Sequence, residues 1–243
     1  MLRYLVAMIS FFLLAEQGLS MSGRKIMEKA QGLPSARTGH STVTMTINKG
    51  GSSTEKQFEV FTSSSDATNK TLMSFNRPSK IKLLTHAHED AEDNQWLRMS
   101  SGRIKRITSS GRGKSFMNSH FTYEDLGSRR IDDYRYKNLG SAKVGSWDCY
   151  KVRSIGKPGK SSYSKTVAYV RKKDFFVVKI DFYKRGKLHK VLKNKKIRKV
   201  KGILTPYLVQ INSARGKGST ELDFEQVQYN INIANSKFSK DNL

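Results

Sequence analysis

The sequence predicts a mainly β protein built on one curved antiparallel sheet. Apolar and polar residues alternate with a period of two in about a dozen segments, and short turns rich in Gly, Ser, Asn or Lys separate these segments. A helical pattern is almost absent between them. Because about a dozen antiparallel strands curl strongly instead of staying flat, we expect the sheet to form a closed or half-closed barrel with room inside.

The first residues have the layout of a secretory signal peptide. Arg3 gives a positive start, and Leu5–Leu14 is an apolar run before several small residues. This run is about half of the roughly 20 apolar residues that cross a bilayer, so a permanent anchor is the weaker interpretation. We therefore expect residues 1–22 to be a signal peptide, cleaved after Ser20 or Ser22, and the mature protein to be exported to the periplasm.

Residues 23–243 contain no linker and are expected to form one domain. A short helix is expected over Gly23–Gln31, because apolar residues recur there at helical spacing before two helix breakers. The expected strands follow in order: Thr42–Ile47, Gln57–Thr62, Thr71–Phe75, Ile81–Thr85, Gln95–Met99, Arg103–Thr108, Tyr134–Leu139, Trp147–Arg153, Thr166–Arg171, Phe176–Tyr183, Leu188–Val200, Tyr207–Ile211 and Thr220–Tyr229.

Composition narrows the classes of function. The chain has one cysteine, Cys149, which excludes an intramolecular disulfide, a CxxC redox pair and a thiolate zinc finger. With 45 Lys and Arg against 20 Asp and Glu, the net charge is +25. Such a surface attracts polyanions such as nucleic acid, anionic lipid or lipopolysaccharide. A signal peptide disfavours nucleic acid, so an anionic membrane is the expected contact.

The positive charge is concentrated near the C-terminal third. Between Arg171 and Lys201 there are 14 Lys and Arg against two Asp, a net charge of +12. The residues expected to dock on an anionic surface are Lys195, Lys196, Arg198 and Lys199. Because basic residues occur on both sides of this strand, an ordinary solvated face remains an equal alternative.

One short string resembles a metal site. His86, His88 and Asp90 resemble the opening of the metallo-β-lactamase-fold signature, in which two histidines and an aspartate gather zinc for hydrolysis. Ala91 stands where that signature has a further histidine. A polar turn between two strands is the preferred interpretation, and a metal-dependent hydrolase is the weaker alternative.

A second string, Gly111–Ser115, ends like a phosphate-binding loop, but Thr108 stands where that loop needs a glycine. We expect a hairpin turn there. The chain shows no nucleophile elbow and no pairing of catalytic residue types, so we expect no catalytic site, no metal and no cofactor, and hence no enzyme.

Several strings together resemble the outer-membrane lipoprotein-sorting proteins, the LolA/LolB-like periplasmic carrier superfamily. They occur in the family's order over nearly all of the mature chain, and the most specific is Phe121–Leu126. The others are individually weak: Gln95–Arg98, Lys105–Ile107, Ser115–Met117, Lys179–Tyr183, Gly186–Lys190, Thr220–Leu222, Phe238 and Leu243. The resemblance implies an incomplete barrel with helices at its mouth, an apolar cavity for acyl chains and no enzyme activity.

A cavity for acyl chains needs apolar side chains on one face of the sheet. The candidates for that face are Met45, Phe58, Val60, Trp96, Phe116, Met117, Val178, Ile180 and Phe182. Exposing acyl chains to water costs about 0.8 kcal/mol per methylene, so a carrier through an aqueous compartment needs such a pocket. The expected function is a carrier of lipid or lipoprotein, with a membrane lipid exporter or an outer-membrane acceptor as partner.

Two questions stay open at this point. The same apolar residues are equally consistent with a solid core, in which case the protein is a secreted basic module that binds anionic polymers or membranes. An unclosed sheet edge could also pair with a neighbouring molecule, so the sequence leaves the oligomeric state open.

Overall fold

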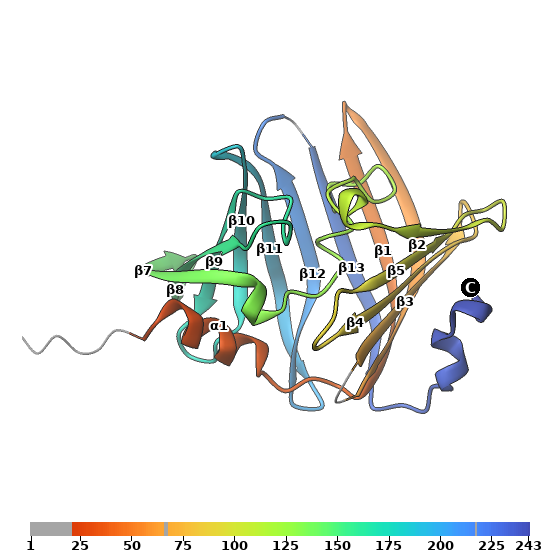
Figure 1. Cartoon of the computed structure of the whole chain (residues 1–243), viewed down its shortest axis with the longest axis horizontal. Coiled ribbons are helices and arrows are strands. Elements are labelled where there is room, and N and C mark those ends of the chain that lie inside the picture. Colours follow the sequence, from red (N-terminus) through yellow and green to blue (C-terminus); the bar gives the residue numbers. More distant parts are fainter. Residues whose placement is uncertain (1–20, 66–67, 217) are drawn as a thin grey trace, which may run out of the picture.

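The computed structural model describes residues 21–65, 68–216 and 218–243, which form a single antiparallel sheet of 13 strands (Figure 1). The predicted signal peptide lies outside the described residues except for its last two. The strands are β1 (Thr38–Lys49), β2 (Ser52–Ser64), β3 (Thr68–Arg77), β4 (Ile81–His88), β5 (Asn94–Arg98), β6 (Ile104–Ile107), β7 (Tyr134–Val144), β8 (Trp147–Gly156), β9 (Lys165–Arg171), β10 (Val177–Lys184), β11 (Lys187–Val200), β12 (Ile203–Ser213) and β13 (Gly218–Tyr229).

The chain enters the sheet in its middle and leaves it there as well. The strand order is β6-β5-β4-β3-β2-β1-β13-β12-β11-β10-β9-β8-β7, so β1 lies beside β13 and the edges are β6 and β7. Figure 1 shows that the sheet curves without closing. The predicted fold class, a curved antiparallel sheet in an incomplete barrel, is confirmed, and each predicted strand corresponds to an observed one.

The alternation of apolar and polar residues along the strands gives the sheet two distinct faces. In β1 every second residue is buried, because Val43, Met45 and Ile47 point to one side while the threonines between them point to the other. We call the side of Val43, Met45 and Ile47 the inner face and the opposite side the outer face.

Among the described residues, one α-helix covers part of the inner face near β7 and β8. Helix α1 (Gly23–Gln31) begins where predicted, and the Ser22 side chain caps it by accepting a hydrogen bond from the Lys25 amide at 3.2 Å. Ile26 is fully buried against Val152 and Ala168. The helix is therefore held by one apolar face packed on the sheet.

Residues 108–133 cross from one edge of the sheet to the other. They leave β6, form the 3₁₀ turns η1 (Ser109–Gly111) and η2 (Ile131–Asp133), and reach β7. The prediction of a hairpin turn at Gly111–Ser115 is therefore wrong, because these residues begin the crossing and join no pair of strands. Phe116 and Phe121, 2% and 4% exposed, pack with the inner-face cluster of β1 and its neighbours. We call residues 108–133 the crossing segment.

The C-terminus covers part of the outer face. The turns η3 (Asn235–Phe238) and η4 (Lys240–Asn242) place Phe238, 1% exposed, in a cluster with Phe61, Leu72 and Leu84. Within the described residues, no helix has the length and apolar character needed to cross a membrane.

Candidate ligand-binding sites

The interior of the curved sheet is filled by the chain itself. Of the predicted cavity residues, Met45, Phe58 and Phe116 lie together in one buried cluster, and Val60 and Met117 pack against it. Phe75 stacks on Phe58, with ring centroids 4.3 Å apart, and its ring centroid lies 5.7 Å from that of Phe116. The crossing segment thus occupies the space between the two halves of the inner face.

The other four predicted cavity residues lie elsewhere. Ile180 packs with the cluster under α1, and Phe182 packs on Tyr163 with ring centroids 4.9 Å apart. Val178 belongs to a cluster around Cys149. Trp96 lies on the outer face under Phe238, because alternation in β5 turns its neighbour Leu97, and not Trp96, toward the inner cluster.

A buried ionic pair holds the crossing segment in place. Lys190 of β11 and Asp125 of the crossing segment form an ion pair whose side chains are each 3% exposed. Lys190 Nζ also donates to the His120 carbonyl at 2.8 Å, and the Tyr163 hydroxyl donates to Asp125 Oδ1 at 2.9 Å. Burial, followed by the Asp125 charge, raises the pKa of Tyr163, so this hydroxyl stays protonated as a donor.

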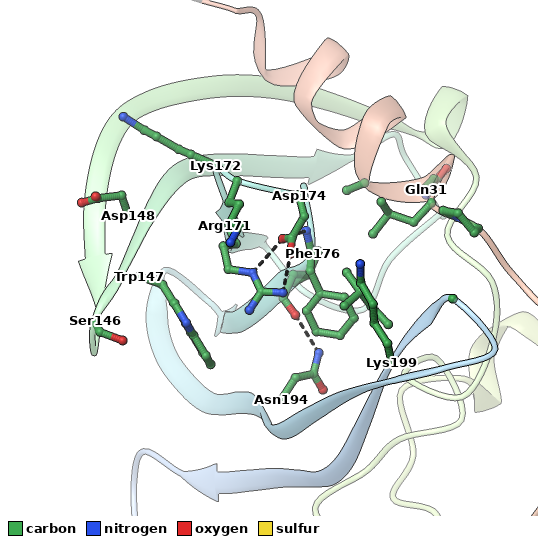
Figure 2. Close-up of a pocket in the computed structure, with 17 residues that line it drawn as sticks. Gln31, Ser146, Trp147, Asp148, Arg171, Lys172, Asp174, Phe176, Asn194 and Lys199 are labelled. Carbon is green, nitrogen blue, oxygen red and sulfur yellow. Dashed lines mark hydrogen bonds and ion pairs between the residues drawn. The ribbon is translucent and has the colours of Figure 1, made fainter.

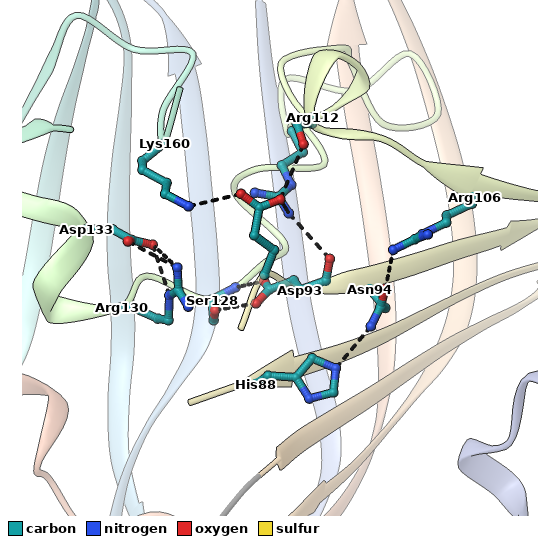
Figure 3. A network of polar contacts seen from close by, with 11 residues as sticks. His88, Asp93, Asn94, Arg106, Arg112, Ser128, Arg130, Asp133 and Lys160 are labelled. Atoms are coloured by element: carbon teal, nitrogen blue, oxygen red, sulfur yellow. Dashed lines mark hydrogen bonds and ion pairs between the residues drawn. The ribbon is translucent and has the colours of Figure 1, made fainter. Parts of the chain in front are cut away.

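A polar network links the crossing segment to both halves of the sheet (Figure 3). Glu92, in the β4–β5 turn, accepts from Lys160 at 3.0 Å and pairs with Arg112 at 3.5 Å. Asp93 accepts from the amide and the hydroxyl of Ser128 at 2.7 and 2.6 Å. These contacts join the β4–β5 turn to the crossing segment and to the β8–β9 loop.

An open cleft lies where several strand ends meet beside the end of α1 (Figure 2). Its volume is about 1240 Å³. Four segments border it, namely residues 30–34 at the C-terminal end of α1, the β7–β8 turn, the β9–β10 turn and the β11–β12 hairpin. The apolar lining residues are Ala30, Leu33, Pro34, Trp147, Phe176, Val177 and Leu204.

The polar groups of this cleft are mostly basic. Arg171 forms a bidentate ion pair with Asp174, in which Nε donates to Oδ1 at 2.7 Å and Nη2 donates to Oδ2 at 2.6 Å. The Arg171 guanidinium also lies 5.1 Å from the centre of the Trp147 ring. Partial burial opposes ionisation of Asp174, but the hydrogen bond from Arg171 helps to lower the pKa of this carboxyl overall. Lys172, Lys173 and Lys199 also line the cleft, and all three are exposed. The cleft therefore combines apolar walls with a cationic rim.

The predicted docking residues do not share one face. Lys199 lies at the cleft, opposite Leu204, whereas Arg198 is paired with Thr205 and therefore points to the other side of the sheet. Lys196 lies at an irregularity of β11, with φ of 49°, and pairs with Asp223 at 3.3 Å. Lys195 is paired with Leu208.

The histidines of the suspected metal motif are engaged in structural contacts. His86 and His88 belong to β4 itself, so the expectation of a turn there is corrected to a strand whose turn begins at Glu89. His86 Nε2 hydrogen-bonds to the Phe238 carbonyl at 2.8 Å, and burial lowers the pKa of this imidazole. His88 Nε2 lies 3.1 Å from Asn94 Nδ2 (Figure 3). In the part of the chain that the structure describes, no three His, Cys, Asp or Glu side chains gather in a metal-binding group.

Sequence reasoning did not find the cleft. Trp147, Phe176 and Leu204 come from three separate turns and strand ends, and their apolar character alone does not distinguish them from core residues. The available signal was an aromatic residue beside clustered lysines, as in Lys172–Phe176.

Comparisons with known proteins give one matching family model and several structures with the same fold. A family model described as "-like: Uncharacterized protein" matches residues 67–243. A DUF1329 family protein from Desulfovibrio piger superposes with a TM-score of 0.85 at 24% identity, over 90% of this chain and 96% of that one. A putative outer membrane lipoprotein-sorting protein domain from Vibrio parahaemolyticus superposes with a TM-score of 0.85 at 25% identity, over 90% of this chain and 97% of that one.

A more distant structure has the same fold. A LolA superfamily protein from Nitrosomonas europaea gives a TM-score of 0.70 at 17% identity, over 92% of this chain and 100% of that one. The comparison with curated proteins gave no match. The chain belongs to the family whose model covers residues 67–243, and it has a LolA-like fold.

Proposed function

We propose that the protein is a non-catalytic periplasmic carrier that holds the acyl chains of a lipid or lipoprotein in an apolar cavity. The observation that carries this proposal is the open cleft of about 1240 Å³ beside α1, whose walls include Leu33, Phe176 and Leu204. Small-molecule sites commonly measure about 300–1,000 Å³, so this cleft has room for a large amphiphile. The donor is a membrane lipid exporter, and the acceptor lies at the outer membrane.

The physical argument is the free energy of transfer. Each methylene removed from water stabilises the complex by about 0.8 kcal/mol, so an acyl chain favours the walls of the cleft over the aqueous compartment. No bond is made or broken in this role. The carrier role requires only a cavity through whose opening the lipid can enter and leave.

The cleft and the interior around Met45 are two possible places for the chains. In this structure the interior is closed by Phe116 and Phe121 of the crossing segment, and the Lys190–Asp125 pair holds that segment. Cargo therefore enters the cleft without rearrangement. It enters the interior only if the crossing segment moves away.

Lipid loading tests the carrier function. We expect lipid to co-purify with the native protein from its host, as identified by mass spectrometry, and a fluorescent fatty acid to bind the delipidated protein. Leu204→Asp places a charge in the cleft and should abolish this binding. Ile104→Asp is the matched control, because Ile104 on β6 is 39% exposed and away from the cleft. Equal loading of both variants, together with no co-purified lipid, would overturn the proposal.

A reversible crosslink tests whether the cargo binds in the cleft or in the interior of the sheet. A Cβ at Gly113 would lie 2.9 Å from Ser162 Cβ, which is shorter than the 3.5–4.5 Å typical of disulfides, so the two loops must separate slightly to form the bond. With that shift, Gly113→Cys together with Ser162→Cys should join the crossing segment to the β8–β9 loop. If cargo lies in the cleft, the oxidised and reduced proteins load equally. Loading that is lost on oxidation and restored by reduction would assign the cargo to the interior.

A further inference from the structure

The outer face of strands β7 to β11 carries an aligned set of cations. One row runs from Lys151 through Tyr169 and Lys179 to Lys193, each paired with the next in the strand register. A second row begins with Lys137 opposite Arg153. We use the name basic face for the following residues of this outer face, to which the register also assigns Lys195: Arg135, Lys137, Lys151, Arg153, Lys165, Lys179 and Lys193.

The basic face is not neutralised by neighbouring carboxylates. Asp181 lies within it but is 6% exposed, and it pairs with Lys179 at 3.1 Å while accepting from the Tyr169 hydroxyl at 3.0 Å. The acidic residues of the outer face lie on other strands, beside the threonines of β1: Glu55, Glu59, Glu221, Asp223 and Glu225. These carboxylates therefore lie on β2 and β13, in the middle of the sheet and away from the basic face.

Aromatic and aliphatic side chains accompany the cations. Lys165 Nζ lies 4.6 Å from the ring centre of Tyr183, and Lys179 Nζ lies 4.4 Å from that of Tyr169. Ile155 and Leu188, at the same end of the face, are 39% and 37% exposed. Basic residues combined with tyrosine and exposed aliphatic side chains are the composition that suits the interface of an anionic bilayer.

We propose that the basic face docks the protein on the surface of an anionic lipid bilayer. The exposed Ile155 and Leu188 favour a lipid surface over a soluble polyanion, which would contact the cations alone. The face also leads to the cleft, because Arg171 follows Tyr169 by two residues in β9 and lines the cleft. Docking therefore brings the cleft close to the membrane, and this part of the argument rests on the proposed carrier function.

Vesicle binding tests the proposal with the full mature protein. We measure co-sedimentation with vesicles of phosphatidylglycerol and phosphatidylcholine, and with phosphatidylcholine alone. Binding is expected only to the anionic vesicles and should disappear at 1 M salt, where the Debye length falls to about 3 Å. The triple variant Lys137→Gln, Lys151→Gln, Lys193→Gln should bind about 100-fold more weakly. Lys179 is kept because it pairs with the buried Asp181.

The control removes the same charge from other places. Lys80→Gln, Lys105→Gln, Lys240→Gln changes three exposed lysines outside β7 to β11 and should bind as the unmodified protein does. Equal binding by the two triple variants overturns the proposal. Fatty-acid loading is measured on both, so a variant that loads normally but does not dock separates this proposal from the carrier function.

A final variant tests whether the basic face binds a membrane or a soluble anionic polymer. Ile155→Ser with Leu188→Ser should weaken vesicle binding while leaving binding to polyphosphate unchanged. If the double variant binds vesicles as tightly as the unmodified protein, the face recognises polyanions in general and not a lipid surface, and the proposal is overturned.

Discussion

Among individual residues, Lys190 is a lysine whose charged group is buried in an ion pair with Asp125. Its ammonium group is withdrawn from water, and burial lowers the pKa of Lys190 while the Asp125 charge raises it. A buried pair gains little over an apolar pair of the same shape, but removing one partner leaves an uncompensated charge. The pair therefore acts as a constraint on where the crossing segment can lie.

Replacing Lys190 by Met should lower the free energy of unfolding by about 3–5 kcal/mol, because Asp125 then remains buried without a cation. Urea denaturation measures the change. Lys193→Met, at an exposed position of the same strand, should stay within about 0.5 kcal/mol of the unmodified protein. Similar losses for the two variants would show that the pair does not hold the segment.

Tyrosine ionisation should weaken the fold at alkaline pH. Burial raises the pKa of Tyr136 and of Tyr169 to about 12 in each case, above the ordinary value near 10. The folded protein then binds more protons than the unfolded chain, so stability is complete below pH 10 and falls as the pH rises from 10 to 12. The denaturation midpoint measured across this range should fall less for Tyr136→Phe. Tyr207→Phe serves as the control, and identical pH profiles for both variants would contradict the assignment.

At the level of elements, α1 depends on a close approach to β7. A Cβ at Gly23 would lie 2.7 Å from the Asn138 nitrogen and from the Lys137 carbonyl carbon, so only glycine lets the first turn of the helix reach the strand. This contact sets the depth at which Ile26 enters the cluster beneath the helix.

Gly23→Ala should therefore push α1 away from the sheet and destabilise the protein by about 1–3 kcal/mol, as overpacking does. Thermal unfolding provides the measurement. Gly111→Ala is the matched control, since a Cβ there meets only ordinary contacts, the nearest at 3.5 Å. A melting temperature that changes no more for Gly23→Ala than for this control would mean that the helix does not need the close approach.

The sequence predicted the elements that follow a period and missed those that do not. In β1 every second residue is buried on one face of the sheet, and this burial is visible in the sequence as an alternation of apolar and polar residues. The crossing segment has no such pattern. Its course is set by long-range contacts, such as Asp125 with Lys190, which are 65 residues apart. The cleft was missed for the same reason, because its lining residues come together only when distant turns converge.

On the scale of the whole molecule, stability should fall from the centre of the sheet to its edges. β1 has a partner on each side and a fully buried Val43, whereas β6 has four residues, of which the first three are exposed. Edge strands open at lower free energy than central ones.

Hydrogen exchange followed by mass spectrometry should show the slowest amides in β1 and β13 and the fastest strand amides in β6. The expected gradient follows the distance of each strand from the two edge strands β6 and β7, which have one hydrogen-bonded neighbour each. Uniform protection across all strands would indicate that the edges are stabilised by a contact other than the sheet.

The pairing of β1 with β13 imposes an order on biogenesis. Gly39 lies opposite Tyr229 in the register, so the first strand acquires its second partner only when nearly the whole polypeptide is present. On the proposed export to the periplasm, a chain that emerges from a translocation channel with its N-terminus first exposes an unpaired β1 until transport is almost finished. Contacts between residues so far apart in sequence also slow folding. During that interval the unpaired strand can pair with a strand of another chain, so on the same proposal a holding chaperone should protect β1 until β13 has arrived.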